Sequence, residues 1–267
     1  MSDFEEDFPK YLAHWLCSER LGRQVIAKKE LPSTNTLLAQ MAESGMQEGL
    51  VVIADAQTGG MGRNGHSWFS PPGRNLYFSL LLRPDCKPAV VPQLAIVAAL
   101  SLHDVVCRLC PGKTICVKWP NDLLCEGAKL SGILCTMSCT GFNVDYAVVG
   151  IGVNVNMAAN EFPEDVKATS LEIMGNGVWD RAFVLAEFLS AFEADYHSWL
   201  SQGNLASFIP RWNECSCLEG QYVEVEQGRE LVSGVVEGIT EEGHLQLRDD
   251  SGKIALAYAG DAHIRKR

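Results

Sequence analysis

Residues 57–75 read QTGGMGRNGHSWFSPPGRN and interrupt the regular apolar pattern on both sides. Four glycines fall within residues 59–65, which excludes a helix or regular strand because glycine adds backbone entropy and no packing surface. The segment predicts a bent loop whose bare N–H groups can approach a ligand. Arg63 suits a phosphate there, and Trp68 suits a flat ring. The spacing is neither a P-loop nor a dinucleotide fingerprint, so a mobile surface loop with a packed tryptophan explains it equally well.

Working outward from this loop, apolar periodicity predicts a core of strands followed by helices. Strands are expected at 50–54, 75–82, 114–119, 129–134 and 145–156, with the pair 114–119 and 129–134 forming a hairpin, and helices at 94–109, 185–199 and 205–212. After Cys217 the sequence pattern changes and predicts short strands at 221–227, 230–236, 245–248 and 254–258. We therefore predict two domains, 1–216 and 217–267, with the second a small β-module docked on the first because its own core is small.

The N-terminal residues predict one short amphipathic helix, with Tyr11, Leu12, Trp15 and Leu16 at helical spacing. Residues 1–30 are too few for a winged-helix DNA reader. The first seven residues are acidic and lack the pattern of a secretory signal, and no apolar run is judged long enough to cross a bilayer. These features predict a cytoplasmic protein.

Composition narrows the class of function. Apolar content of 47% and charged content of 21% are typical of a soluble globular protein. A net charge of −11 argues against sequence-independent nucleic-acid binding, which needs clustered lysine and arginine. The ten cysteines lie mostly in apolar runs, and the pairs 107/110 and 215/217 lack zinc-ribbon spacing, so a metal centre is not expected.

Polar motifs follow several of the predicted elements, and each has an ordinary structural reading beside a functional one. Ser33-Thr34-Asn35 opens a helix, where it can cap the helix or face a ligand. The turn Lys118-Trp119-Pro120-Asn121-Asp122 places Asp122 where it can hold Mg²⁺, accept a proton or cap an Asx turn. Lys129 can neutralise an anion or stay solvated. Glycines at 150 and 152 indicate close approach by a ligand or by another backbone.

The order of these motifs is more specific than any one of them. The 33–35 triplet, the glycine loop, the 118–122 turn, Lys129-Leu130-Ser131-Gly132-Ile133-Leu134 and Gly150-Ile151-Gly152-Val153-Asn154 together resemble the biotin protein ligases, from about residue 30 to the C-terminus. The resemblance implies an α+β fold, a mixed sheet flanked by helices like that of class II synthetases, with a C-terminal SH3-like β-barrel. The absent winged helix suggests the branch without a DNA-binding domain.

The resemblance also implies roles for individual residues. Biotin-contacting positions correspond to Ser33, Thr34, Asn35, Gln57, Gly60, Met61, Gly62, Arg63, Lys129 and Gly132. Nucleotide-binding positions correspond to Arg63, His66, Trp68, Asn121, Asp122, Lys129 and Asn154, and the catalytic candidates are Arg63, Lys129 and Asp122. Met61 and His66 stand where the family often has basic residues, which makes the phosphate cradle less positive.

The implied reaction is a two-step ligation that uses ATP and Mg²⁺. Biotin is first activated as biotinyl-5′-AMP with release of pyrophosphate, and a lysine of a biotin carboxyl carrier protein or carboxylase acceptor domain then displaces AMP. No nucleic-acid or membrane partner is expected, and a homodimer is left open. Rival readings are a lipoate or octanoate transferase, whose Arg-Arg-x-Ser-Gly-Gly-Gly loop is absent from the sequence, a transcription-repressing adenylate sensor, and a structural protein with inactive pockets.

Overall fold

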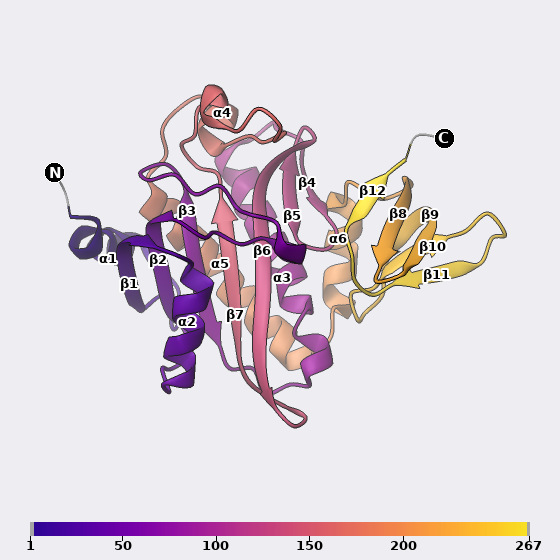
Figure 1. The fold of residues 1–267 in the computed structure, drawn as a ribbon, viewed down its shortest axis with the longest axis horizontal. Helices are drawn as coiled ribbons and strands as arrows, with labels where there is room; N and C mark the ends of the chain where they lie inside the picture. The colour runs from indigo at the N-terminus through magenta and orange to yellow at the C-terminus, as the bar shows by residue number, and fades with distance from the viewer. Residues whose placement is uncertain (1–2, 266–267) are drawn as a thin grey trace.

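The computed structural model describes residues 3–265 (Figure 1). The strands are β1 (Gln24–Leu31), β2 (Leu50–Gln57), β3 (Leu76–Leu82), β4 (Ile115–Lys118), β5 (Asp122–Cys125), β6 (Ala128–Thr140), β7 (Asn143–Val153), β8 (Tyr222–Gln227), β9 (Glu230–Ile239), β10 (Leu245–Arg248), β11 (Ile254–Ala257) and β12 (Ala262–Ile264). The helices are α1 (Phe4–Trp15), α2 (Thr34–Glu43), α3 (Gln93–Leu109), α4 (Leu171–Gly175), α5 (Arg181–Gln202) and α6 (Ile209–Cys215), with 3₁₀ turns η1 (Arg63–Gly65), η2 (Pro88–Val90), η3 (Ala159–Glu161) and η4 (Ala206–Phe208).

Seven strands form the larger sheet in the order β1-β2-β3-β7-β6-β5-β4. Strands β1 and β2 pair in parallel and the other neighbours pair antiparallel, so the sheet is mixed. The smaller sheet is antiparallel, in the order β11-β10-β9-β8-β12. The expected α+β class, a mixed sheet flanked by helices with a small C-terminal β-module, is confirmed.

The two faces of the larger sheet pack different helices because successive side chains of a strand point to opposite faces. Helices α1, α3 and α5 cover one face and share its core with residues such as Val51 and Phe78. Phe188 of α5 lies edge-on to Phe78 and stacks on Phe192, and its full burial contributes about 1.5–3 kcal/mol. Helix α2 covers part of the opposite face through Leu38 and Ala42.

A shallow floor of small residues lies on the α2 face of the larger sheet. Ser79 of β3 pairs with Gly150 of β7. Gly152 of β7 pairs with Gly132 of β6. Four adjoining positions therefore carry a hydroxymethyl group or no side chain, which leaves space above the sheet next to the N-terminus of α2.

The C-terminal sheet docks on the rest of the chain at one end of the larger sheet (Figure 1). Trp119 Nε1 donates a hydrogen bond to the carbonyl of Gly243 at 3.0 Å, and the Leu205 N–H donates to the carbonyl of Glu241 at 2.9 Å. Gly243 has a positive φ of 88° and lies against the side chains of Ile96 and Leu205. The predicted docking is confirmed, and it brings the segment before β12 to the turn that contains Asn121.

The strands at 50–54, 75–82 and 145–156 and the helix at 94–109 are confirmed with small shifts of boundary. The predicted hairpin is wrong, because β5 pairs with both β4 and β6 and separates them. Strand β5 is only four residues long and begins at the last residue of the 118–122 turn, so its apolar alternation is too short to be recognised beside that motif. Strands β1 and β12 were also missed, because the charged run at residues 28–30 breaks the apolar pattern of β1 and because β12 is only three residues long.

Two expectations about apolar segments need correction. In α1 the buried side chains are Phe8 and Leu12, whereas Tyr11 and Trp15 are exposed, so the helix buries a face rotated from the predicted one. The segment Pro88–Leu109 is 22 residues long with a mean hydropathy of 1.8, which by length and composition is enough to cross a membrane. It contains α3, and 72% of its apolar window is buried inside the protein, as in a core helix.

Candidate active site

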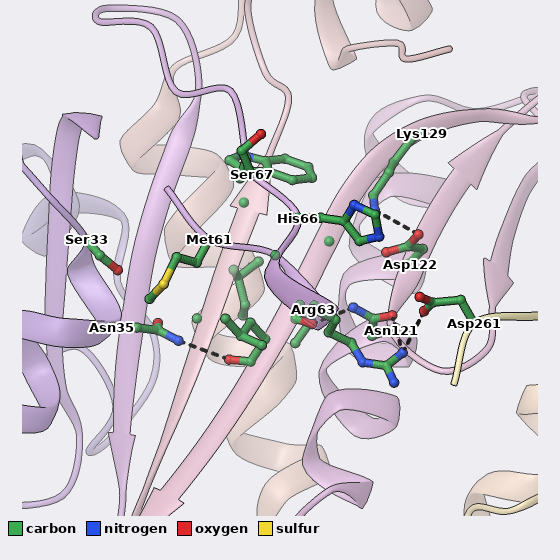
Figure 2. Close-up of a pocket in the computed structure, with 18 of the residues that line it drawn as sticks. Ser33, Asn35, Met61, Arg63, His66, Ser67, Asn121, Asp122, Lys129 and Asp261 are labelled. Carbon is green, nitrogen blue, oxygen red and sulfur yellow. Dashed lines mark hydrogen bonds and ion pairs between the residues drawn. The ribbon is translucent and has the colours of Figure 1, made fainter. Parts of the chain in front are cut away.

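A cavity of about 310 Å³ lies above the floor of small residues (Figure 2). Its walls come from four segments that are far apart in the sequence: the start of α2, the glycine loop, the 118–122 turn with β6, and residues 261 and 263 at and in β12. The predicted residues that line it are Ser33, Thr34, Asn35, Gln57, Met61, Gly62, Arg63, His66, Trp68, Asn121, Asp122, Lys129 and Gly132. The structure thus brings most of the predicted biotin-side and nucleotide-side positions into one space.

The start of α2 forms the neutral polar end of this cavity. Ser33 occupies the N-cap position, but its side chain makes no capping hydrogen bond and is therefore not committed to the helix. The backbone N–H of Thr34 donates instead to Gln57 Oε1 at 2.9 Å, so a side chain of β2 caps the helix from outside. Of the two readings of the 33–35 triplet, ordinary capping by its own hydroxyls is not the one observed.

Asn35 is held against the floor of the cavity. Its Nδ2 donates to the carbonyl of Leu134 at 3.3 Å, and its Oδ1 accepts a short hydrogen bond from Ser79 Oγ. A Cβ atom added at Gly150 would lie 2.0 Å from Asn35 Oδ1. Gly150 is thus required by the close approach of a side chain, rather than by a ligand or another backbone as the sequence suggested.

The glycine loop folds back on itself across the cavity. The Trp68 N–H donates to the carbonyl of Gly60 at 2.9 Å, and the Gly62 N–H donates to the carbonyl of His66 at 2.6 Å. A Cβ at Gly60 would lie 2.5 Å from the Trp68 carbonyl oxygen, so the closure requires glycine there. The predicted bent loop is confirmed, and the turn η1 at its tip carries Arg63.

Arg63 bonds to two different parts of the protein (Figure 2). Its Nη1 lies 3.1 Å from Asp261 Oδ1 and 3.3 Å from Asn121 Oδ1, and the guanidinium also donates to the carbonyl of Gly260. Asn121 is buried and its Nδ2 donates to the carbonyl of Ile133 at 2.7 Å. The amide of Asn121 therefore ties Arg63 to β6 at the wall of the cavity.

The second cation of the cavity is Lys129. Its Nζ lies 2.8 Å from Asp122 Oδ2 and 5.6 Å from the centre of the Trp68 ring. The other oxygen of the carboxylate, Asp122 Oδ1, is buried without a hydrogen-bond partner, and so is Trp68 Nε1. Buried polar atoms are normally paired, so these two mark places where a bound molecule can complete the bonding.

A further cavity of about 560 Å³ lies on the other side of Trp68 and shares Gln57, Ser67, Trp68 and Lys129 with the first. Gly60 and Asn154, two predicted site residues, line this second cavity and not the first. Asn154 is buried at the end of β7, and its Nδ2 donates to the carbonyl of Lys129. The predicted set is thus divided between two adjoining spaces with Trp68 and Lys129 at the boundary.

The cysteines play no visible part in either cavity. Burial raises the pKa of the Cys135 and Cys215 thiols to about 12, so both stay protonated at neutral pH. Among residues 3–265 there is no group of three or more histidine, cysteine, aspartate or glutamate side chains placed to hold a metal ion.

Comparison with known proteins identifies the family. The model of the biotin/lipoate A/B protein ligase family matches residues 28–154, and that of the biotin protein ligase C-terminal domain matches residues 220–265. A biotin–[acetyl-CoA-carboxylase] ligase of Paracoccus denitrificans is 33% identical over 231 residues, covering 85% of this chain and 95% of that protein. The chain belongs to the biotin protein ligase family.

Other members of the biotin protein ligase family agree in sequence and in structure. The bifunctional ligase/repressor BirA of Bacillus subtilis is 33% identical over 93% of this chain and 76% of its own length. The Aquifex aeolicus biotin protein ligase, solved in complex with biotin and ATP, superimposes with a TM-score of 0.78 at 29% identity, covering 92% of this chain and 100% of that one. Membership makes the chain a ligase and removes the reading of a structural protein.

Several residues of the ligase site escaped the sequence prediction. Ser79 was counted only as a strand residue, although its pairing opposite Gly150 puts its hydroxyl between Thr34 and Asn35. Asp261 and His263 belong to the C-terminal module and reach the cavity only through docking. Lys118 lines the same cavity and stood in the quoted turn without a role. A serine facing a glycine across paired strands is a pattern that the pairing alone reveals.

Proposed function

We propose that this chain activates biotin with ATP and transfers it to a lysine of a biotin carrier protein. The observation that carries the proposal is one cavity that joins a neutral polar end at Ser33–Asn35 to a cationic end at Arg63 and Lys129. Biotin has the same division, with a neutral ureido ring at one end and a carboxylate at the other. Membership of the ligase family supports the same assignment.

The neutral end suits the ureido ring because that ring needs donors for its carbonyl and acceptors for its two N–H groups. Ser33 offers an uncommitted hydroxyl, and the side chains of Thr34 and Asn35 are already oriented by Gln57 and Ser79. Groups fixed before binding lose little entropy on binding. The floor of glycines leaves room for the ring beneath them.

The cationic end suits the first chemical step. The biotin carboxylate attacks the α-phosphorus of ATP, a P–O bond to the β-phosphate breaks, and biotinyl-5′-AMP and pyrophosphate form. This step needs alignment and charge neutralisation more than a protein nucleophile. Arg63 and Lys129 supply the charge, and each is balanced by a carboxylate, Asp261 and Asp122, until an anion competes for it.

Asp122 is also the residue that fits a magnesium ion. Its buried Oδ1 lacks a partner, and magnesium in nucleotide sites is held by one or two carboxylates together with substrate phosphates. When bound, Mg²⁺ would offset the negative charge of the phosphate chain. A site with one carboxylate agrees with the lack of a larger cluster of acidic ligands among the described residues.

In the second step the amine of the carrier lysine attacks the carbonyl carbon of the mixed anhydride, the C–O bond to the phosphate breaks, and AMP leaves. The attacking amine must lose a proton. Asp122 can accept or orient it through the unpaired Oδ1 while Lys129 holds the other oxygen. The folded glycine loop would shield the anhydride from water during the wait for the carrier.

The partner we propose is a carrier domain and no nucleic acid or membrane. The net charge of −11 supports a protein partner over a polyanion. A cytoplasmic location agrees with the acidic N-terminal sequence.

The test is to incubate the protein with ATP, Mg²⁺, labelled biotin and a biotin carrier domain, and to look for covalent label on the carrier. A carrier whose acceptor lysine is changed to arginine is the control and should remain unlabelled. Lipoate offered in place of biotin should give no transfer. Absence of label together with absence of biotin-dependent pyrophosphate release would refute the proposal, and transfer of lipoate alone would favour the rival transferase.

A further inference from the structure

Two buried asparagines form a short hydrogen-bonded chain behind the second cavity. Asn75 is fully buried just before β3, and its Nδ2 donates to Asn154 Oδ1 at 3.3 Å. Asn75 Oδ1 accepts from the backbone N–H of Val155 at 2.9 Å. At the other end, Asn154 Nδ2 donates to the carbonyl of Lys129 at 3.3 Å.

Backbone groups at both ends fix the direction of this chain. A backbone N–H can only donate, so the atom of Asn75 that faces Val155 must be its oxygen and the atom that faces Asn154 must be its nitrogen. A backbone carbonyl can only accept, so the atom of Asn154 that faces Lys129 must be its nitrogen. Both ends require the same orientation of the Asn154 amide, with oxygen toward Asn75 and nitrogen toward Lys129.

Other groups also hold Asn75 in place. Its Nδ2 also contacts the sulfur of Met157, and its backbone carbonyl accepts a hydrogen bond from Arg181 Nη1 at 3.0 Å. Arg181 is in turn paired with Asp55 at 2.8 Å. The amide of Asn154 is therefore supported through Asn75, whose backbone is held by Arg181 of α5 and, behind it, Asp55 of β2.

The fixed amide still has bonding capacity for a ligand. An asparagine side chain has two N–H donors and two acceptor lone pairs, and the protein uses one of each on Asn154. Asn154 lines the second cavity together with the Trp68 ring and Lys129. One acceptor and one donor therefore remain for a planar molecule that stands in this cavity.

A 6-aminopurine matches this pair, because its amino group donates and an adjacent ring nitrogen accepts, as in asparagine contacts to adenine. A 6-oxopurine presents an oxygen where the amide needs a donor. We propose that Asn75 is a positioning residue that, through Asn154, makes the second cavity select a 6-aminopurine nucleotide over a 6-oxopurine one. This inference rests on the proposed function, since it concerns the nucleotide of that reaction.

The test compares ATP with inosine triphosphate, which differs at the 6 position, by biotin-dependent pyrophosphate release. Asn75→Asp keeps the acceptor for Val155 N–H and replaces the donor toward Asn154 with an acceptor. The Asn154 amide can then no longer satisfy both neighbours in its present orientation. We expect the ratio of kcat/KM for ATP to that for inosine triphosphate to fall at least about tenfold, or ~1.4 kcal/mol.

Two further variants keep the result decisive. Asn75→Ala frees the amide of Asn154 without burying a carboxylate, and the same ratio should move toward unity if Asn75→Asp fails to fold. Asn156→Ala is the matched control, since Asn156 is buried in the same segment, bonds the backbone of Trp179 and lines neither cavity. It should leave the ratio unchanged.

The proposal is overturned if folded Asn75 variants keep the wild-type ratio, if wild type does not distinguish the two nucleotides, or if Asn156→Ala shifts the ratio as much. Failure of the proposed function has a different signature, because wild type would then release no pyrophosphate from biotin and ATP. In that case the ratio of binding constants for the two nucleotides, measured by calorimetry, tests Asn75 in its place.

Discussion

Gly150 and Gly152 stand two residues apart on β7, and alanine at each position should impair the use of a different substrate of the first step. A Cβ at Gly152 would lie 2.4 Å from Trp68 Cε2 and 2.5 Å from its Nε1. A Cβ at Gly150 would lie 2.0 Å from Asn35 Oδ1. Gly152→Ala therefore displaces the Trp68 ring between the two cavities, and Gly150→Ala displaces Asn35 at the neutral polar end.

The size of the effect follows from these distances. An ordinary contact begins at about 3.4 Å, so Gly152→Ala must move the Trp68 ring by about 1 Å and Gly150→Ala must move Asn35 by somewhat more. A misplacement of about 1 Å in an aligned site can lower the rate by about 10²-fold. We expect kcat/KM for ATP to fall about ten- to hundredfold in Gly152→Ala, and kcat/KM for biotin to fall by a similar factor in Gly150→Ala.

Pyrophosphate release measured at varied ATP and at varied biotin separates the two variants. Gly177→Ala is the control for the substitution itself, because a Cβ at Gly177 meets nothing within 4 Å. Thermal melts should show that both site variants remain folded, with losses of about 1–3 kcal/mol from overpacking. The reasoning is refuted if both alanines change the two kinetic constants in parallel, or if either variant matches wild type.

Three other changes have defined outcomes. Arg63→Gly should let biotinyl-5′-AMP escape into solution, because it removes a cation and the ion pair that ties the glycine loop to Asp261. If the variant retained the intermediate for as long as wild type, Arg63 would have no role in retention. Lys129→Ala should slow biotin-dependent pyrophosphate release about 10²–10³-fold, and an unchanged rate would remove it from the catalytic set. Burial raises the pKa of Glu193, but bonds from the N–H groups of Leu21, Glu19 and Arg20 outweigh it and leave the pKa below 4.5. Glu193 therefore stabilises the fold above the unfolded pKa, and acid melts of wild type should lose that contribution as pH falls through the lower folded value, whereas Glu193→Gln should lose less over the same range.

The sequence was informative wherever a local rule applied. The apolar runs of β2 and β3 and the 3.6-residue period of α3 each specify an element without help from the rest of the chain. Four clustered glycines exclude regular structure, and the loop at 57–75 is where they predicted it. The order of the polar motifs was enough to indicate the ligase family.

Pairing between distant segments was not visible in the sequence. Strand β5 lies between the two strands that were expected to form a hairpin, because its four residues satisfy β4 and β6 at once. Gly150 and Gly152 attracted attention as sites of close approach, but the side chains of Asn35 and Trp68 that approach them come from other elements. Such contacts depend on register across the sheet, which local periodicity does not encode.

By itself, the sequence determined which residues could bind a ligand, because the charge, hydrogen-bonding groups and size of a side chain depend only on the residue type. The tertiary structure alone decided how those groups share their bonds. In the folded chain Arg63 pairs with Asp261, which lies 198 residues away, and Asn75 fixes the orientation of the Asn154 amide. Asp122 Oδ1 and Trp68 Nε1 are left without a hydrogen-bond partner. The physical reason is that each polar atom can make only a few hydrogen bonds. Which of these remain for a substrate depends on the neighbours that the fold brings to that atom.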